Sequence, residues 1–384
     1  MREWKKVKLG DICERVTSGG TPKANVTSYY SPPTIPWLKT KEVNYCRITE
    51  TENYISEEGL NNSSAKLISP NSVIIAMYGQ GDTAGRVAIN KIPLTTNQAC
   101  CNLTIDENKA DYEFIYYQLC TLYNKMVSLK AGAAQPNLNA QIIKNLEVLL
   151  PSLSIQHRIA TILSRYDSLI ENYQKQIKLL EEAAQRLYKE WFVDLRFPGY
   201  ENTKIVDGVP EGWIPMKLGD LAEFKRGNTI TKKDAVDGSI PVVAGGLEPA
   251  YYCDKSNTAE RVITVSGSGA NAGFTRMYFE KVWASDCSFV DIKTTPFLHF
   301  VYCFLKDNKT TIDNMQKGAA QPHVYAKDIN TLELCVPNKS ALTSFENNAS
   351  KYFDTISYLQ SQIRFLTEAR DRLLPKLMSG EIEV

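Results

Sequence analysis

Basic and small polar side chains gather in several loop-like stretches of this chain, and these residue types are the ones that contact nucleic acids. Lys and Arg neutralise phosphates, whereas Asn, Gln and Ser form hydrogen bonds with base edges. A single cluster of this kind is usually ordinary solvated surface, so clusters that recur at corresponding places carry more weight. The candidates for phosphate or base contacts are Lys23, Lys39, Lys41, Arg86, Arg226, Lys232 and Arg276, and the candidate polar readers of bases are Asn97, Gln98, Ser268 and Asn271.

Two glycine-rich stretches, residues 79–85 and 267–273, share a Gly-x-Gly-x-x-Ala-Gly pattern, and each follows an apolar, strand-like run. A dinucleotide site would need a helix directly after such a loop, but the segments that follow alternate like strands. Each loop is therefore either a tight turn or a place where glycine lets the backbone approach a DNA phosphate, with Arg86 or Arg276 nearby.

Recognisable catalytic and metal-binding residue sets are absent from the sequence. It has no Walker motif, nucleophile elbow or nuclease-like acid cluster, and its three histidines share no ligand spacing. Its nine cysteines include no CxxC pair, so neither a disulfide framework nor a zinc knuckle is expected. We therefore predict a non-catalytic protein with reduced thiols, no metal and no cofactor of its own.

Two long heptad repeats are the elements that must position these loops. The first occupies residues 154–192, and the second begins at Ser340 and follows the first by 186 residues at every repeat position. An apolar seam at this spacing is typical of paired helices, since a long helix with one apolar stripe is unstable alone in water. A simple helical hairpin or dimerisation device is the alternative for either repeat taken singly. The seam positions are Ile159, Tyr166, Tyr173, Leu180 and Leu187, and then Phe345, Tyr352, Leu359, Leu366 and Leu373.

The chain between and before these helices is also duplicated. The opening Trp4 to Ile12 recurs as Trp213 to Leu221, and a Gly-Ala-Ala-Gln-Pro block occurs at 132–136 and again at 318–322. Short β-rich runs with one amphipathic helix, near 112–125 or 296–305, indicate an α+β fold for each copy. We expect globular parts at 1–150 and 201–336, a central long helix with its linker at 151–200, and a C-terminal long helix at 337–384.

Composition leaves the partner open. The chain has 384 residues and a formal net charge of +1, so a nucleic-acid partner would require a local basic surface. The sequence has no long apolar run and no signal peptide pattern, so we expect no membrane association and a cytoplasmic location.

As a tandem set, these motifs resemble the DNA-specificity (S) subunit of type I restriction-modification systems over the whole chain. That resemblance implies two target-recognition domains, 1–150 and 201–336, each reading one half of a split DNA sequence. It also implies that the two long helices pack antiparallel as a spacer that fixes the gap. The second copy departs from the first where Trp37 becomes Val242. The resemblance is carried by the two Trp openings, Ser18 to Pro22, Ile35 to Trp37, the two Gly-Ala-Ala-Gln-Pro blocks and Pro151 to Ile159.

The partners implied by the resemblance are double-stranded DNA, two methyltransferase (M) subunits and a motor-nuclease (R) subunit. S-adenosylmethionine and adenine methylation would belong to the M subunits. A rival hypothesis is a coiled-coil scaffold whose β-rich domains bind proteins, which predicts neither a DNA footprint nor a methyltransferase partner. Because each copy carries its own helix, we also expect residues 1–200 alone to pair into a symmetric dimer.

Overall fold

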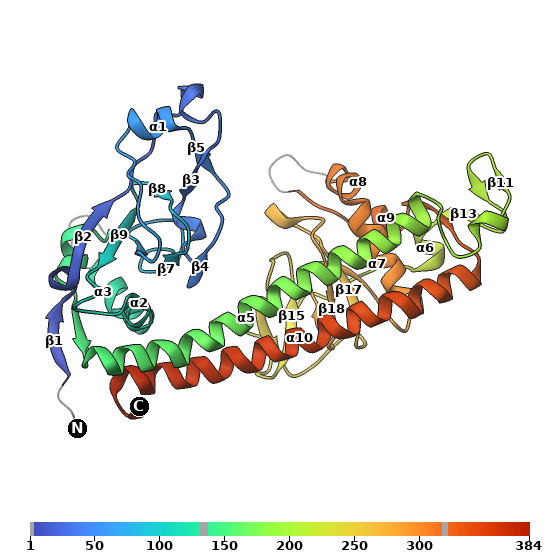
Figure 1. Ribbon diagram of the computed structural model, residues 1–384. Helices are drawn as coiled ribbons and strands as arrows, with labels where there is room; N and C mark the ends of the chain where they lie inside the picture. The colour runs from blue at the N-terminus through green and yellow to red at the C-terminus, as the bar shows by residue number, and fades with distance from the viewer. Residues whose placement is uncertain (1–3, 131–136, 317–321) are drawn as a thin grey trace. The chain divides into compact units, whose positions relative to one another are not determined.

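The computed structural model describes residues 4–130, 137–316 and 322–384. Contacts divide the chain into two compact units: unit 1 comprises residues 1–171 and 364–384, and unit 2 comprises residues 172–363. Each unit thus combines one globular part with a section of each long helix (Figure 1). The tandem α+β organisation expected from the sequence is present. Both Gly-Ala-Ala-Gln-Pro blocks lie outside the described residues, apart from Pro322.

Unit 1 contains a five-stranded sheet in the order β2-β9-β6-β7-β4 and a three-stranded sheet in the order β5-β3-β8, while β1 pairs antiparallel with β10. The pairs β4–β7 and β3–β8 are parallel, and the other pairs are antiparallel. The strands are β1 (Lys5–Lys8), β2 (Cys13–Ser18), β3 (Ile35–Leu38), β4 (Cys46–Ile48), β5 (Tyr54–Ile55), β6 (Val73–Ala76), β7 (Val87–Asn90), β8 (Thr95–Thr96), β9 (Cys100–Ile105) and β10 (Glu147–Leu150). The short helices are α1 (Glu57–Asn61), α2 (Tyr112–Thr121), α3 (Tyr123–Lys130) and α4 (Ala140–Lys144).

Unit 2 repeats this plan with a four-stranded sheet, β14-β20-β17-β18, a three-stranded sheet, β16-β15-β19, and the pair β13–β21. The strands are β11 (Ile205–Val206), β12 (Val209–Pro210), β13 (Ile214–Lys217), β14 (Lys225–Arg226), β15 (Ile240–Val243), β16 (Tyr251–Cys253), β17 (Val262–Ser266), β18 (Thr275–Tyr278), β19 (Trp283–Ala284), β20 (Cys287–Asp291) and β21 (Glu333–Val336). The short helices are α6 (Leu218–Leu221), α7 (Leu298–Asp307), α8 (Lys309–Asn314) and α9 (Ala326–Ile329).

The long helices are α5 (Leu153–Tyr188), which continues into a π-helical turn at Lys189–Val193, and α10 (Lys339–Ser379). Of the seam positions, Ile159, Phe345 and Leu359 are buried, whereas the other seven are only half-buried. The deeper row lies one turn further on and includes Leu163, Ala184, Ala349 and Ile356. The globular parts pack on this deeper row. The heptad spacing alone does not show which of the two rows is more buried.

Each unit has its own apolar core, to which the long helices contribute. In unit 1, Phe114 of α2 and Ile159 of α5 belong to the same cluster as Leu377 of α10. In unit 2, the ring of Phe345 lies 5.0 Å from that of Phe192 and 5.9 Å from that of Trp191. Burial of such aromatic side chains dominates the stability of a core. Both long helices are therefore held by tertiary packing in each unit.

The state of the cysteines and the hydropathy of the helices can be compared with the expectations from the sequence. All nine cysteines are free thiols, and five of them are buried. Within the described ranges, no helix is long and apolar enough to cross a membrane. The expected helix over 112–125 differs slightly from the structure, because Leu122 leaves helical geometry and divides that segment into α2 and α3.

Candidate nucleic-acid interface

The two glycine-rich loops are hairpin connections between antiparallel strands. Residues 79–85 join β6 to β7, and residues 267–273 join β17 to β18. Gly85 and Gly273 have φ angles of +92° and +87°, a region that favours glycine over residues with a side chain. A strand rather than a helix follows each loop, as the sequence predicts, and the approach of either loop to a DNA phosphate stays a prediction.

Arg86 and Arg276, which follow these loops, are each tied to an acidic side chain of their own unit. Arg86 Nη2 lies 2.6 Å from Asp82 Oδ1, and its guanidinium lowers the pKa of the Asp82 carboxyl. Arg276 Nη1 donates to the Leu247 carbonyl at 2.7 Å and lies 3.2 Å from Glu248 Oε1. Either arginine would have to exchange its carboxylate for a DNA phosphate.

Lys39 precedes the 3-10 turn Thr40–Glu42 and Lys41 lies within it, and both side chains contact other residues of unit 1. Lys39 Nζ donates to Asn53 Oδ1 at 3.0 Å and stands 5.0 Å from the centre of the Trp37 ring. Lys41 forms an ion pair with Glu52, whose hydrogen bond and charge raise the Lys41 pKa. These contacts orient the two lysine side chains. They also occupy part of the hydrogen-bonding capacity that each ammonium group would need for a phosphate.

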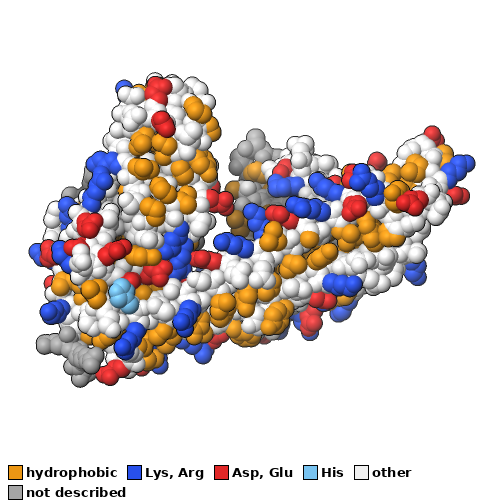
Figure 2. All heavy atoms as spheres, viewed as in Figure 1, with side chains coloured by type: hydrophobic (Ala, Val, Ile, Leu, Met, Phe, Trp, Pro, Cys, Tyr) orange, Lys and Arg blue, Asp and Glu red, His pale blue; other side chains and the backbone are white. Residues whose placement is uncertain are grey.

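Three other basic candidates are exposed. Lys23, Arg226 and Lys232 form no ion pair or side-chain hydrogen bond with any residue in the described ranges. On the face drawn in Figure 2, Lys and Arg side chains lie among Asp and Glu and do not merge into one basic patch. Lys23 and Lys232 lie outside helices and strands, whereas Arg226 belongs to the short strand β14, and as phosphate contacts all three stay predictions.

One tryptophan contact recurs in both units although the tryptophans are not at matching sequence positions. Trp37 Nε1 donates to the Gly20 carbonyl at 3.1 Å, and Trp283 Nε1 donates to the Asn228 carbonyl at 2.7 Å. Gly20 and Asn228 are equivalent, since their backbone N–H groups bond to Thr96 and Ala284 before the matching strands β9 and β20. The replacement of Trp37 by Val242 is thus compensated within the same pair of strands. Trp37 pairs with Thr95 in unit 1, and Val242 pairs with Trp283 in unit 2.

The candidate polar readers lie in two connections between strands. Asn97 and Gln98 lie between β8 and β9, and Ser268 and Asn271 lie between β17 and β18. Gln98 is exposed, and its Oε1 accepts a hydrogen bond from the Thr21 hydroxyl. Asn97 Oδ1 accepts from the Cys100 thiol at 3.3 Å, while Asn271 Nδ2 donates to the Gly245 carbonyl at 3.4 Å. Asn97 and Asn271 therefore brace their own loops, whereas Gln98 offers a more exposed amide.

Asp286 is a candidate that sequence reasoning missed. Ala76 pairs with Cys100 in unit 1 and Ser266 pairs with Cys287 in unit 2, and Gly19 and Gly227 donate to the Cys100 and Cys287 carbonyls, so these two cysteines are equivalent. Asp286 stands one residue before this position, and Gln98 stands two residues before its counterpart in unit 1. The Ser268 hydroxyl donates to Asp286 Oδ2, as the Thr21 hydroxyl does to Gln98. An isolated aspartate in a loop carries no local signal, and only the structure shows that Asp286 lies in the turn before β20, as Gln98 lies in the turn before β9.

The structure brings some candidates together and leaves others apart. In unit 1, contacts link the loop around Gly20, the Trp37 ring with Lys39, and the turn with Gln98. Arg86 instead contacts Asn44 and Asp82. In unit 2, Asn228 is linked to Trp283, and Ser268 to Asp286. In each unit a tryptophan thus holds one polar loop through a hydrogen bond to its backbone.

A family model described as the type I restriction modification DNA specificity domain matches residues 1–182 and 210–368. The MjaIX type I restriction enzyme specificity subunit of Methanocaldococcus jannaschii is 28% identical over 100% of this chain and 94% of that protein. The EcoR124I/EcoR124II specificity subunit of Escherichia coli is 28% identical over 51% of this chain and 48% of that protein. A crystal structure of a type I restriction-modification S subunit from M. genitalium aligns with a TM-score of 0.60 and 17% identity, covering 98% of this chain and 96% of that one.

Proposed function

The chain belongs to the type I restriction-modification DNA specificity family, and on this premise we propose that it reads a two-part DNA sequence with a fixed gap. It is a non-catalytic recognition subunit. The observation that carries the proposal is the duplication itself, because two related globular parts with different polar loops suit two different half-sites. The scaffold hypothesis, which requires no DNA, does not agree with the family membership.

The long helices would act as the spacer. In unit 1 the end of α10 lies against the beginning of α5, since Arg370 contacts Asp167. In unit 2 the beginning of α10 lies against the end of α5, since Phe345 contacts Trp191. These contacts, taken unit by unit, support an antiparallel pair. A stiff spacer adds the affinities of the two halves through effective concentration, provided that both can bind at once.

Partner subunits would supply the chemistry. We propose that two M subunits with S-adenosylmethionine methylate adenine at the selected sequence, that an R subunit completes the restriction enzyme, and that the assembly acts in the cytoplasm. Large apolar side chains remain exposed on both long helices, where an M subunit could cover them. They are Leu169 and Phe365 in unit 1 and Leu179 and Tyr358 in unit 2, with exposed fractions of 42%, 57%, 63% and 63%.

Deletion of this gene is expected to remove adenine methylation from one two-part sequence with a fixed gap. Single-molecule sequencing of the source genome, with the gene intact and deleted, would identify that sequence directly. Re-expression of the intact chain in the deleted strain is the control and should restore the modification. The proposed function would be wrong if a methyltransferase co-purified with this protein and yet deletion of the gene removed no methylated motif.

Replacing Asp286 with alanine is expected to relax one base position in the second half-site and leave the first half-site unchanged. A carboxylate can accept a hydrogen bond from the cytosine amino group, and one such contact is worth about 1–3 kcal/mol of discrimination. The matched variant Gln98→Ala should alter the first half-site only. Methylation profiles of the two variants would test both changes, and a uniform weakening across all sequences would contradict base reading by Asp286.

A further inference from the structure

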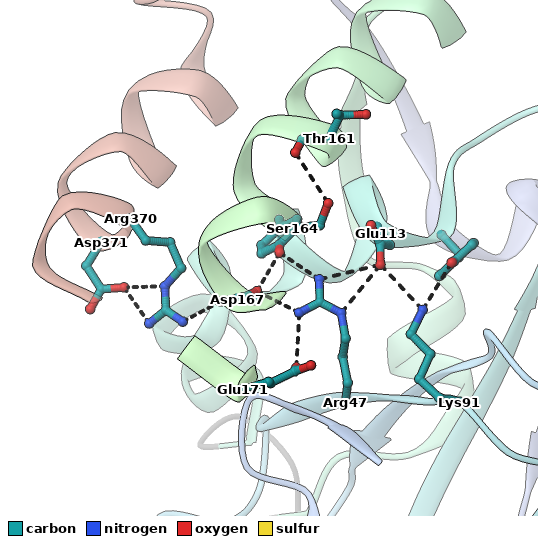
Figure 3. Close-up of polar contacts among 11 residues, drawn as sticks. Arg47, Lys91, Glu113, Thr161, Ser164, Asp167, Glu171, Arg370 and Asp371 are labelled. Atoms are coloured by element: carbon teal, nitrogen blue, oxygen red, sulfur yellow. Dashed lines mark hydrogen bonds and ion pairs between the residues drawn. The ribbon is translucent and has the colours of Figure 1, made fainter. Parts of the chain in front are cut away.

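A buried network of charged side chains in unit 1 joins the first globular part to both long helices (Figure 3). Its centre is Arg47 of β4, whose side chain is only 6% exposed. The Arg47 guanidinium lies 3.1 Å from Asp167 Oδ2 and 3.3 Å from Glu171 Oε1 of α5, and 3.4 Å from Glu113 Oε1 of α2. From α10, Arg370 Nη1 donates to Asp167 Oδ1 at 2.6 Å.

Asp167 is the residue on which these contacts converge. One oxygen accepts from Arg370, and the other accepts from the Tyr117 hydroxyl and lies against Arg47. Burial and the nearby Asp167 charge raise the pKa of Tyr117, so this hydroxyl stays protonated and donates. A carboxylate buried in this way is tolerated because its charge is compensated and its oxygens have partners.

Unit 2 has apolar or small residues at the equivalent helix positions. The residue 186 places after Asp167 is Phe353, and the residue 186 places before Arg370 is Ala184. Phe353 is 2% exposed and stacks on the His299 ring at 4.6 Å, while Ala184 is 1% exposed. His299 is itself the counterpart of Glu113. Asp167, Arg370 and Glu113 are thus all replaced in unit 2.

The apolar seam alone does not distinguish α5 from α10, because both helices carry it in the same register. If α5 paired with the α5 of a second copy, Ala184 of that copy would stand where Arg370 stands, and Asp167 would lose its partner. If α10 paired with a second α10, Arg370 would meet Phe353. Removing one partner of a buried pair leaves an uncompensated charge, which strongly disfavours the arrangement.

We propose that the Asp167–Arg370 ion pair, held in place by Arg47, selects the pairing of α5 with α10 and disfavours pairing of either helix with its own copy in another molecule. This inference rests on the antiparallel helix pair of the proposed function. A polar contact within an apolar seam is a known way of fixing partner and register. It also revises the expectation of a symmetric dimer of residues 1–200, since such a dimer would bury Asp167 without Arg370.

The test uses the full chain carrying either of two affinity tags, with both tagged forms co-expressed so that pairing is chosen during folding. The double variant Asp167→Phe with Arg370→Ala gives unit 1 the residues of unit 2 at these positions. We expect mixed assemblies, recovered by sequential purification on both tags and sized by light scattering, to rise about tenfold or more over the unchanged chain. The charge-free pair Asp167→Asn with Arg370→Gln, which keeps polar side chains of similar size, should behave in the same way.

The matched control is Arg372→Ala, which removes an arginine from the same helix whose side chain is 79% exposed and pairs with Glu368. It should leave the fraction of mixed assemblies unchanged. If the charge-free pair, folded by circular dichroism, gave no more mixed assemblies than the control, the pairing role would be wrong, whatever its effect on melting. The measurement involves no DNA, so its failure would leave the proposed function untouched.

Discussion

Inserting one heptad into both long helices, after Leu180 in α5 and after Ser357 in α10, is expected to abolish recognition of the original two-part sequence. The two sites face each other in the proposed antiparallel pair, because each is the same number of residues from the Asp167–Arg370 contact. Seven helical residues lengthen the spacer by roughly 10 Å at about 1.5 Å per residue. That distance is about three base pairs, or roughly a third of a DNA turn. The second globular part would therefore face the wrong side of the helix at the original gap, with a loss of about a hundredfold or more in avidity.

Sequencing of methylated adenines in a strain that carries only the lengthened subunit would measure this loss. The matched control places the same seven residues in the turn between β11 and β12, at Asp207 and Gly208, where both φ angles are positive and both residues are exposed. That insertion leaves the helices intact and should preserve the target. A motif with a longer gap would support the spacer model, and an unchanged motif with the helix insertion would refute it.

The long helices were predictable because their signal is local and repeated. Heptad spacing places α5 and α10 close to their observed ends, and the strand-like runs before the two glycine-rich stretches coincide with β6 and β17. Burial within the heptads was less predictable. Leu163 is deeper than Tyr166 because the first globular part packs on that face, and such packing depends on tertiary contacts that no local pattern contains.

The sequence predicted the residue types of the candidate site, but it could not show which of the basic side chains are already paired with carboxylates. The spacing of Lys41, Arg86 and Arg276 does not reveal that each lies against a carboxylate from its own unit. Trp283 was missed because it takes the place of Trp37 from the neighbouring strand, which only the strand pairing shows. Asp286 was missed because its contact with Ser268 joins residues 18 positions apart. Arg47 was missed because its acidic partners Glu113 and Glu171 are 66 and 124 residues away in the sequence.

Replacing Arg47 with methionine is expected to lower the free energy of unfolding of unit 1 by about 3–5 kcal/mol, the usual cost of removing one partner from a buried ion pair. Methionine keeps much of the apolar volume, so the loss would come from charge rather than from a cavity. Asp167, Glu113 and Glu171 would remain close together without the guanidinium that now lies within 3.4 Å of an oxygen of each. Burial alone would lower the pKa of Arg47, but Tyr117, Asp167 and Glu113 outweigh it and raise that pKa.

Hydrogen exchange followed by mass spectrometry in increasing urea would measure this loss, because peptides from α2 report unit 1 and peptides from α7 report unit 2. The α2 peptides should lose protection at lower urea, and the α7 peptides should change little. The control Arg15→Met removes an exposed arginine from β2 of the same unit and should change stability by less than about 0.5 kcal/mol. Adding Glu171→Met to Arg47→Met should restore part of the loss, since Glu171, which pairs with Arg47, would otherwise be left as an uncompensated carboxylate. If the double variant had a lower free energy of unfolding than the Arg47→Met variant, the loss could not be attributed to uncompensated charge.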